Sequence, residues 1–139
     1  PVYLAREEWP FLTDAAQNLS ASLGMPIASK SASDVRDLAV GSTLELESTR
    51  WVVGDVSGHS PGGRSLYCAE HTVVIVGDAL FAGSVGRVDF PHSNGPTLMA
   101  NIKKTLMTLP DETRVLSGHG PETTIGAERT TNPYILNGL

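Results

Sequence analysis

The sequence predicts a mixed α/β fold in a single domain covering residues 1–139. In two stretches the apolar residues recur at three- and four-residue steps, which is the period of one face of a helix. Several short apolar stretches bounded by turn residues are typical of β-strands. A length of 139 residues suits one domain rather than two. We therefore expect helices and strands to share one core.

The first part of the chain carries one expected strand and one expected helix. Residues 1–4 predict a short strand, and the apolar residues between Glu7 and about Ser22 follow the helical period. Pro10 falls in the first turn of that helix, where its missing N–H is not needed. A Gly-Met-Pro sequence is expected to end the helix. The small and polar residues 27–42 predict an irregular connector.

The remaining residues predict a strand-rich region with two further helices. Residues 72–76 form a continuous apolar run, which indicates a buried strand. This strand and the one before it are expected to form a hairpin around Ala69-Glu70-His71. The expected strands are Ser42–Glu47, Trp51–Val56, Arg64–Cys68, Thr72–Val76 and Arg114–Leu116, and the expected helices are Pro96–Leu109 and Gly126–Thr130.

Composition excludes several classes of partner. The net charge is −5, and the only adjacent basic pair is Lys103-Lys104, whereas nucleic-acid binding needs a concentrated basic surface. The sequence holds no apolar run of the length of a membrane span. Its single cysteine, Cys68, excludes an internal disulfide and favours a reducing compartment. We expect a cytoplasmic protein that binds neither nucleic acid nor membrane.

Three expected strands each run into a glycine-flanked residue of a type that binds metals. These are His59 in Gly58-His-Ser-Pro-Gly62, Asp78 in Gly77-Asp-Ala-Leu-Phe81, and His119 in Gly118-His-Gly-Pro-Glu122. Imidazole and carboxylate groups are ligands that Zn²⁺, Fe²⁺ and Mn²⁺ accept. Loops held by a rigid sheet are common places for functional residues. The spacing alone does not show that the three residues meet.

Each of these residues also has an ordinary structural interpretation. A histidine in a Gly-Pro turn is usually a solvated turn residue, and an aspartate after a strand commonly caps the next segment. For His71 and His92, in a turn and a polar loop, the structural interpretation is the better one. Cys68 stands among apolar strand residues and is expected in the core rather than at a nucleophilic site.

Taken together, the three loops resemble the metallo-β-lactamase superfamily, and within it the glyoxalase II-like branch of hydroxyacylglutathione hydrolase relatives. The resemblance runs through most of residues 52–135, in the order and spacing of the family. Two longer stretches carry it beyond the ligand loops: Gly77 to Pro91, and Gly118 to Gly126 with the ending Glu128-Arg-Thr-Thr-Asn-Pro133.

The resemblance implies an αββα sandwich with a metal site at the loop ends. His59 is similar to the third histidine of the first metal site, and His119 to the last histidine of the second. Asp78 is similar to the aspartate that bridges both metals, and is the residue to which catalysis is assigned. Two metal ions, zinc or alternatively iron or manganese, would activate water and polarise a scissile carbonyl. The implied reaction is hydrolysis of a small-molecule thioester or ester.

Arg87 stands where glyoxalase II-like enzymes place a basic residue for the thiol portion of the substrate. A guanidinium at this position could hold a glutathione carboxylate through two hydrogen bonds. An ion pair with another residue of the protein is the equally weighted structural alternative. Substrate binding is therefore assigned to Arg87 as an expectation.

The sequence departs from the family in lacking the His-x-His-x-Asp-His motif that supplies four further ligands. In full-length relatives this motif lies shortly before a segment similar to residues 1–4, so the chain is expected to correspond to the C-terminal half of the sandwich. With three ligands divided between two metals, metal binding by this chain alone is expected to be weak or absent, because catalytic zinc sites typically have three protein ligands each. We expect the chain alone to be inactive and to expose surfaces that favour self-association.

Two other functions remain open beside the metal-dependent hydrolase. One is a persulfide dioxygenase with a single iron, because that branch also ends its Gly-Asp loop in a string similar to Arg87-Val-Asp-Phe90. The other is a half-domain without catalytic activity, which the missing upstream motif favours. The substrate, the metal and the oligomeric state are left undecided by the sequence.

Overall fold

The computed structural model describes residues 1–28 and 34–139, which fall into two compact units, Pro1–Ala39 and Val40–Leu139. The first unit contains a two-stranded parallel sheet of β1 (Val2–Leu4) and β2 (Val35–Asp37). Between these strands lie the 3₁₀ turn η1 (Arg6–Glu8) and the short helix α1 (Trp9–Thr13). The expected strand at residues 1–4 is therefore confirmed.

The helix expected from Glu7 to Ser22 is wrong beyond Thr13. Asp14 is in an extended conformation, and its carboxylate accepts hydrogen bonds from the backbone N–H groups of Ala16 and Gln17 at 2.9 and 3.3 Å. An aspartate side chain bonded to the backbone two and three residues later replaces the helical hydrogen bonds with a turn. Leu19, with φ of 66°, also lies outside the helical region.

The irregular connector expected at residues 27–42 is only partly open to comparison, because residues 29–33 lie outside the described residues. Within the described part the expectation is wrong at Val35–Asp37, which forms β2. Val35 pairs with Val2 in the parallel ladder. A strand of three residues gains its hydrogen bonds from a distant partner, so its local composition gave no sign of it.

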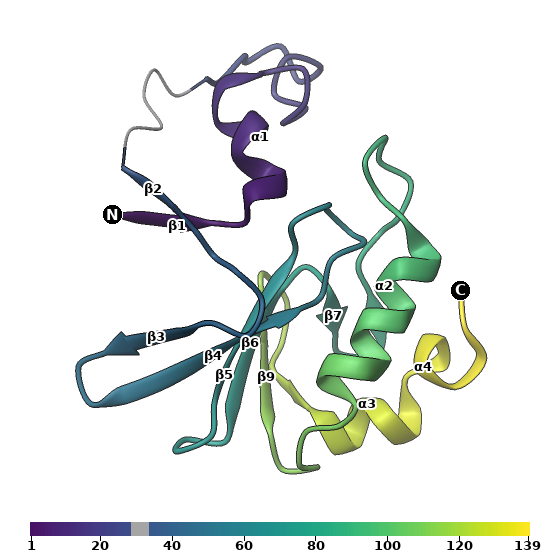
Figure 1. Cartoon of the computed structure of the whole chain (residues 1–139). Helices are drawn as coiled ribbons and strands as arrows, with labels where there is room; N and C mark the ends of the chain where they lie inside the picture. The colour runs from purple at the N-terminus through teal and green to yellow at the C-terminus, as the bar shows by residue number, and fades with distance from the viewer. Residues whose placement is uncertain (29–33) are drawn as a thin grey trace. The chain divides into compact units, whose positions relative to one another are not determined.

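The second unit is built on a six-stranded sheet in the order β10-β9-β6-β5-β4-β3 (Figure 1). β6 and β9 are parallel, and every other neighbouring pair is antiparallel. The expected strands are confirmed to within two residues at each end. The six strands are β3 Thr43–Leu46, β4 Thr49–Asp55, β5 Arg64–Cys68, β6 Val73–Gly77, β9 Arg114–Ser117 and β10 Thr123–Thr124.

Helices of this unit lie on one side of the sheet (Figure 1). The expected helix at Pro96–Leu109 is confirmed as α2 (Gly95–Asn101), which continues into the π-helical turn η2 (Ile102–Leu106). Two further helices follow near the C-terminus, α3 (Ile125–Thr131) and α4 (Pro133–Asn137). None of the helices among the described residues has the length and hydropathy needed to cross a bilayer.

The core fills the space between the sheet and these helices. Val74 and Val76 point to the same face of β6, since alternate strand residues share a face, and both are buried. They pack in one cluster with Leu98, Ile102 and Leu106 from α2 and η2, which are fully buried. This unit is therefore one sheet layer covered by one helix layer, two of the four layers expected of the αββα sandwich.

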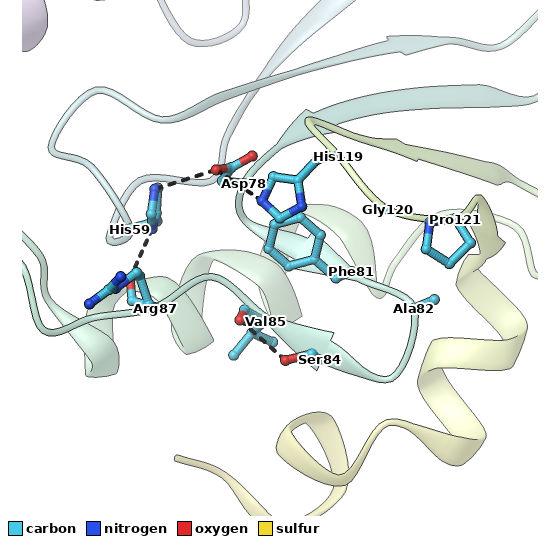
Figure 2. Close-up of a pocket in the computed structure, with 10 residues that line it drawn as sticks. All are labelled: His59, Asp78, Phe81, Ala82, Ser84, Val85, Arg87, His119, Gly120 and Pro121. Atoms are coloured by element: carbon cyan, nitrogen blue, oxygen red, sulfur yellow. Dashed lines mark hydrogen bonds and ion pairs between the residues drawn. The ribbon is translucent and has the colours of Figure 1, made fainter.

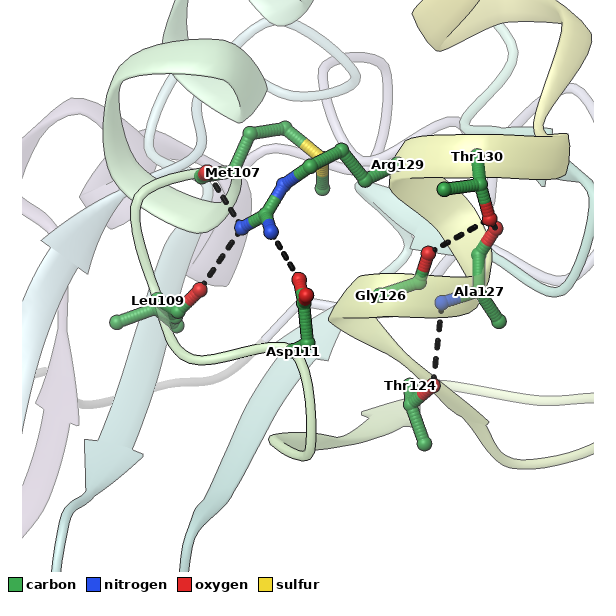
Figure 3. Close-up of polar contacts among 8 residues, drawn as sticks. All are labelled: Met107, Leu109, Asp111, Thr124, Gly126, Ala127, Arg129 and Thr130. Carbon is green, nitrogen blue, oxygen red and sulfur yellow. Dashed lines mark hydrogen bonds and ion pairs between the residues drawn. The ribbon is translucent and has the colours of Figure 1, made fainter.

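Arg129 of α3 fastens the segment that follows η2 (Figure 3). Its Nη2 donates to the backbone carbonyls of Met107 and Leu109 at 2.8 and 2.9 Å, and its Nη1 pairs with Asp111. Carbonyls near the end of a helix lack partners within the helix, so an arginine there supplies the missing donors. The contact holds the end of η2 against α3.

Candidate metal centre

The three glycine-flanked loops meet because of the strand directions in the sheet. β4 and β6 are each antiparallel to β5, so they run in the same direction, and β9 is parallel to β6. Loops that leave the ends of β4, β6 and β9 therefore emerge at the same edge of the sheet. His59, Asp78 and His119 follow these three strands in turn, and all three line one cavity of about 420 Å³ (Figure 2). The cavity is lined by His59, Asp78, Phe81, Ala82, Ser84, Val85, Arg87, His119, Gly120 and Pro121.

The His59 ring is held with one nitrogen turned towards Asp78. Its Nδ1 lies 2.9 Å from the backbone carbonyl oxygen of Arg87. A carbonyl oxygen only accepts hydrogen bonds, so Nδ1 carries the proton, and in the neutral ring Nε2 then keeps its lone pair. Nε2 lies 3.9 Å from Oδ2 of Asp78. Orientation of a histidine by such a carbonyl is the usual arrangement behind a metal ligand.

The loop around His59 is fixed from the side of α2. The hydroxyl of Ser93 donates to the backbone carbonyl of His59 at 2.7 Å, and the backbone N–H of Asn94 donates to Gly58 at 2.7 Å. Gly58 has φ of 133°, and a Cβ atom there would collide with the backbone of Leu98. Glycine is therefore required at this position, where the loop crosses the start of α2.

Asp78 lies between the two histidines and close to a neighbouring backbone. Its carboxylate contacts Gly118, where any Cβ atom would overlap Oδ1 of Asp78. The backbone N–H of Gly118 donates to the carbonyl of Gly77 at 2.9 Å, which ties the two loops together. The absence of a side chain at Gly118 is what gives the carboxylate room between the loops.

His119 faces the same carboxylate oxygen from the opposite loop. Its Nε2 lies 3.6 Å from Oδ2 of Asp78, and its ring stacks on Phe81 with the ring centroids 4.6 Å apart and the planes at 30° (Figure 2). The side chain is 73% exposed. The contact with Phe81 is therefore the main packing that the structure gives to an otherwise open ring.

The three side chains form two His–Asp pairs that share Asp78. Two ligands bound to one tetrahedral metal at about 2.1 Å lie about 3.4 Å apart, so separations of 3.6 and 3.9 Å are near that value. Among residues 1–28 and 34–139, however, no group of three or more His, Cys, Asp or Glu side chains is close enough to hold one metal ion. The donor chemistry fits a metal, and the arrangement fits an aspartate shared by two metals better than a three-ligand centre.

Arg87 lines the cavity, but its charge is already paired. Its Nε and Nη2 both donate to the carboxylate of Asp89 at 2.6 Å, and its guanidinium lies 4.4 Å from the centre of the Phe90 ring. These hydrogen bonds lower the pKa of Asp89 to about 2. This ion pair is the structural alternative to substrate binding by Arg87, and an anionic substrate group would have to compete with Asp89 for the guanidinium.

Phe81 and Asp89 are functional candidates that the pattern of ligand types did not point to. Phe81 stacks on His119 because it belongs to the hairpin of β7 (Leu80–Phe81) and β8 (Ser84–Val85), which neither periodicity nor composition revealed. Asp89 stands two residues after Arg87, and this spacing of opposite charges in the sequence could have indicated that the two side chains pair. His71 is in the turn between β5 and β6 and does not line the cavity, as expected.

Curated relatives match most of this chain, which spans less than two thirds of the length of the first of them. "Probable metallo-hydrolase YqgX" of Bacillus subtilis is 41% identical over all of this chain and 65% of its own length. "Hydroxyacylglutathione hydrolase GloC" of Haemophilus influenzae is 31% identical over 96% of this chain and 63% of its own length. These names describe the relatives.

Solved structures share the fold. BLEG-1 B3 metallo-β-lactamase aligns with a TM-score of 0.90 and 39% identity over 97% of this chain and 65% of that chain. TTHA1623, solved in a di-iron-bound form, aligns with a TM-score of 0.80 and 40% identity over 96% and 64%. ETHE1 from Myxococcus xanthus aligns with a TM-score of 0.69 and 27% identity over 88% and 57%.

A family model confirms the resemblance of the three ligand loops. The model of the metallo-β-lactamase superfamily matches residues 1–119, which includes all three candidate ligands and crosses the boundary between the two compact units. The fold, the order of the loops and this match agree. The chain therefore belongs to the metallo-β-lactamase superfamily.

Proposed function

We propose that His59, Asp78 and His119 are metal ligands in a hydrolase that cleaves small thioesters or esters. One observation carries the proposal: the Nε2 atoms of both histidines approach the same oxygen of Asp78 from separate loops. A structural role for Asp78 would not require two imidazoles at that oxygen. Membership of a metal-binding superfamily and the similarity to GloC support the same reading.

The residues of the chain each have a part in this chemistry. A metal bound there would supply Lewis-acid polarisation of a carbonyl group and activation of water. His59 is oriented for ligation through its Nδ1 contact with the Arg87 carbonyl, and Asp78 would hold both metal positions. Phe81 and Val85 give the cavity an apolar wall that fits an acyl or thioether portion of a substrate. A thiolate leaves readily, so the site needs no strong general acid.

We propose zinc as the metal, with iron as the alternative. Zinc suits imidazole and carboxylate ligands, while the di-iron form of TTHA1623 shows that a relative 40% identical to this chain binds iron. Metal supply decides between such ions as much as ligand type does. Elemental analysis of the protein purified from its own host, compared with protein grown with added zinc or iron, distinguishes the two.

A persulfide dioxygenase is the second candidate. It is favoured because ETHE1, which is 27% identical to this chain, is a persulfide dioxygenase. The two reactions differ in their need for oxygen, because hydrolysis of a thioester consumes water and no oxygen. Oxygen uptake with glutathione persulfide would support the dioxygenase. Release of thiol from a glutathione thioester without oxygen uptake would support the hydrolase.

The activity is best tested on a protein in which the expected His-x-His-x-Asp-His segment precedes Pro1, because the chain alone is expected to be inactive. Thiol release from a glutathione thioester is followed with Asp78→Ala, His119→Ala and the control His71→Ala, whose residue lies outside the cavity. We expect Asp78→Ala and His119→Ala to lose activity, and His71→Ala to keep the activity of the unaltered protein. Activity that survives both substitutions would rule out the ligand assignment.

A further inference from the structure

A buried glutamate contacts the β7–β8 hairpin and takes no part in the proposed chemistry. Glu128 of α3 is only 2% exposed. Its carboxylate accepts hydrogen bonds from the backbone N–H of Gly83 at 3.0 Å, the hydroxyl of Thr123 at 2.6 Å and Nδ2 of Asn132 at 2.7 Å. Carboxylates are rarely buried to this degree unless donors satisfy them, and these three donors come from three separate segments.

Asn132 extends the same network to the next residue of the hairpin. It is fully buried, and its Nδ2 also donates to the backbone carbonyl of Ser84 at 3.0 Å. Its Oδ1 accepts from the backbone N–H groups of Tyr134 and Ile135, which caps α4. Glu128 and Asn132 lie one helical turn apart. Glu128 therefore binds Gly83, and Asn132 binds Ser84, in the β7–β8 hairpin.

That hairpin forms one wall of the cavity. Phe81, Ala82, Ser84 and Val85 all line it, and Phe81 pairs with Ser84 across the antiparallel ladder. Phe81 then stacks on His119, whose side chain is 73% exposed. A chain of direct contacts thus runs from the Glu128–Asn132 network through the hairpin to a candidate metal ligand.

The base of the hairpin and its tip are held in different ways. Leu80 is fully buried and Val85 is 8% exposed, so apolar packing anchors the base. At the tip, Gly83 and Ser84 are bound by the polar groups of Glu128 and Asn132. We therefore expect apolar packing to keep the base of the hairpin in place when the polar contacts are removed, while the tip and the Phe81 ring gain freedom.

We propose that Glu128 and Asn132 are positioning residues that fix the β7–β8 hairpin so that Phe81 holds the His119 ring towards Asp78. This role goes beyond the assignment of the ligands, because the contacts that carry it are made without a metal ion. Simple destabilisation of the fold would affect the whole chain. The positioning role instead confines the effect to the hairpin and His119.

Nuclear magnetic resonance of the His119 ring protons tests this directly, because a stacked aromatic ring shifts their resonances upfield. Phe81→Leu gives the reference value without the stack. Glu128→Ala removes all three acceptor contacts, and Asn132→Ser keeps an α4 cap while its side chain is too short to reach Ser84. Thr131→Ala is the matched control on the same helix, since the bond that its hydroxyl makes among the described residues is to the carbonyl of Ala127 within α3.

We expect the His119 resonances of Glu128→Ala and Asn132→Ser to move most of the way to the Phe81→Leu value, and those of Thr131→Ala to stay at the wild-type value. Glu128→Gln should restore the wild-type shift. Its amide oxygen can accept from Gly83 and Asn132, and its amide nitrogen can donate to the Thr123 hydroxyl.

Wild-type His119 shifts in a folded Asn132→Ser protein would overturn the proposal, even if the melting temperature fell. If Glu128→Ala does not fold, Asn132→Ser and the rescue by Glu128→Gln still decide the question. The measurement uses metal-free protein, so failure of the ligand assignment would leave its result unchanged. A metal titration of the same samples reports on that assignment separately.

Discussion

Gly118 lies against the Asp78 carboxylate. We expect alanine at this position to displace that carboxylate, and so to lower metal affinity, while leaving the stability of the fold nearly unchanged. The added Cβ atom would lie well inside 3.0 Å of Oδ1 of Asp78, a separation that real Cβ atoms essentially never show. Restoring an ordinary contact needs a movement of about 1 Å. Because the side chain of Asp78 is 37% exposed, it can rotate away without disturbing the core.

The cost to stability should therefore be small and the cost to the site large. We expect Gly118→Ala to change the free energy of unfolding by less than about 0.5 kcal/mol, as for surface substitutions. Metal affinity should fall about 10–100-fold, the range seen when groups that orient metal ligands are disturbed. Urea denaturation measures the first quantity, and calorimetric titration with Zn²⁺ of the protein carrying the expected upstream ligands measures the second.

Gly86→Ala is the matched comparison. A Cβ atom at Gly86 would collide with the backbone carbonyl oxygen of Asp78 and lie 3.0 Å from Cβ of His59. Backbone cannot rotate away, so this variant should lose about 1–3 kcal/mol of stability, as overpacked cores do. Equal destabilisation by both alanines, or unchanged metal affinity in Gly118→Ala, would show that the Asp78 carboxylate does not rotate away from the added methyl group.

Three further predictions concern the scaffold and the cavity rim. Replacing Arg129 with alanine should cost about 2 kcal/mol in urea denaturation, since two backbone carbonyls lose a charged donor (Figure 3); an unchanged midpoint would contradict the anchoring role. Leu98→Ala should cost about 2–5 kcal/mol because Leu98 is fully buried, whereas Leu136→Ala, at 58% exposure, should cost less than about 0.5 kcal/mol. The carboxyl of Asp89 should titrate with a pKa of about 2 and return towards 3.8 in Arg87→Ala, measured by carbon-detected resonance. Because folding lowers this pKa, the contribution of the pair to stability is present above pH 3.8 and is lost as the pH falls towards 2.

Apolar runs and helical periodicity in the sequence were enough to predict the strands and helices that are buried along one face. The apolar run at residues 72–76 formed β6, and the periodic residues from Pro96 formed α2 and η2. Both segments are buried along one face, so their sequence records that burial. The same periodicity misled between Asp14 and Ser22, where the aspartate side chain competed for backbone N–H groups.

The shorter elements were beyond local patterns. β7 and β8 have two residues each, β10 also has two, and α4 has five, all below the length at which periodicity is visible. β2 depends on a partner more than thirty residues away. Such elements take their hydrogen bonds from distant groups, and for the hairpin these include Glu128 and Asn132.

The candidate ligands could be predicted from the sequence because their side chains are of metal-binding types. That they meet in one site could be predicted only from the family resemblance. Ligand type and flanking glycine marked His59, Asp78 and His119, while the common direction of β4, β6 and β9 was not visible in the sequence. The division of the ligands between two metals stays a prediction, as does the self-association of the chain. The single domain also stays a prediction, although the chain forms two compact units.

Paramagnetic broadening of the histidine ring resonances by Co²⁺, in excess over this chain, tests whether His59, Asp78 and His119 form a shared metal centre. The effect detects even weak binding. His71 is an internal control, because it lies at the far end of β6, about 20 Å from Asp78. We expect broadening of His59 and His119 together, no broadening of His71, and loss of the effect in Asp78→Ala. Broadening that spares either His59 or His119, or that survives Asp78→Ala, would contradict a metal centre shared through Asp78.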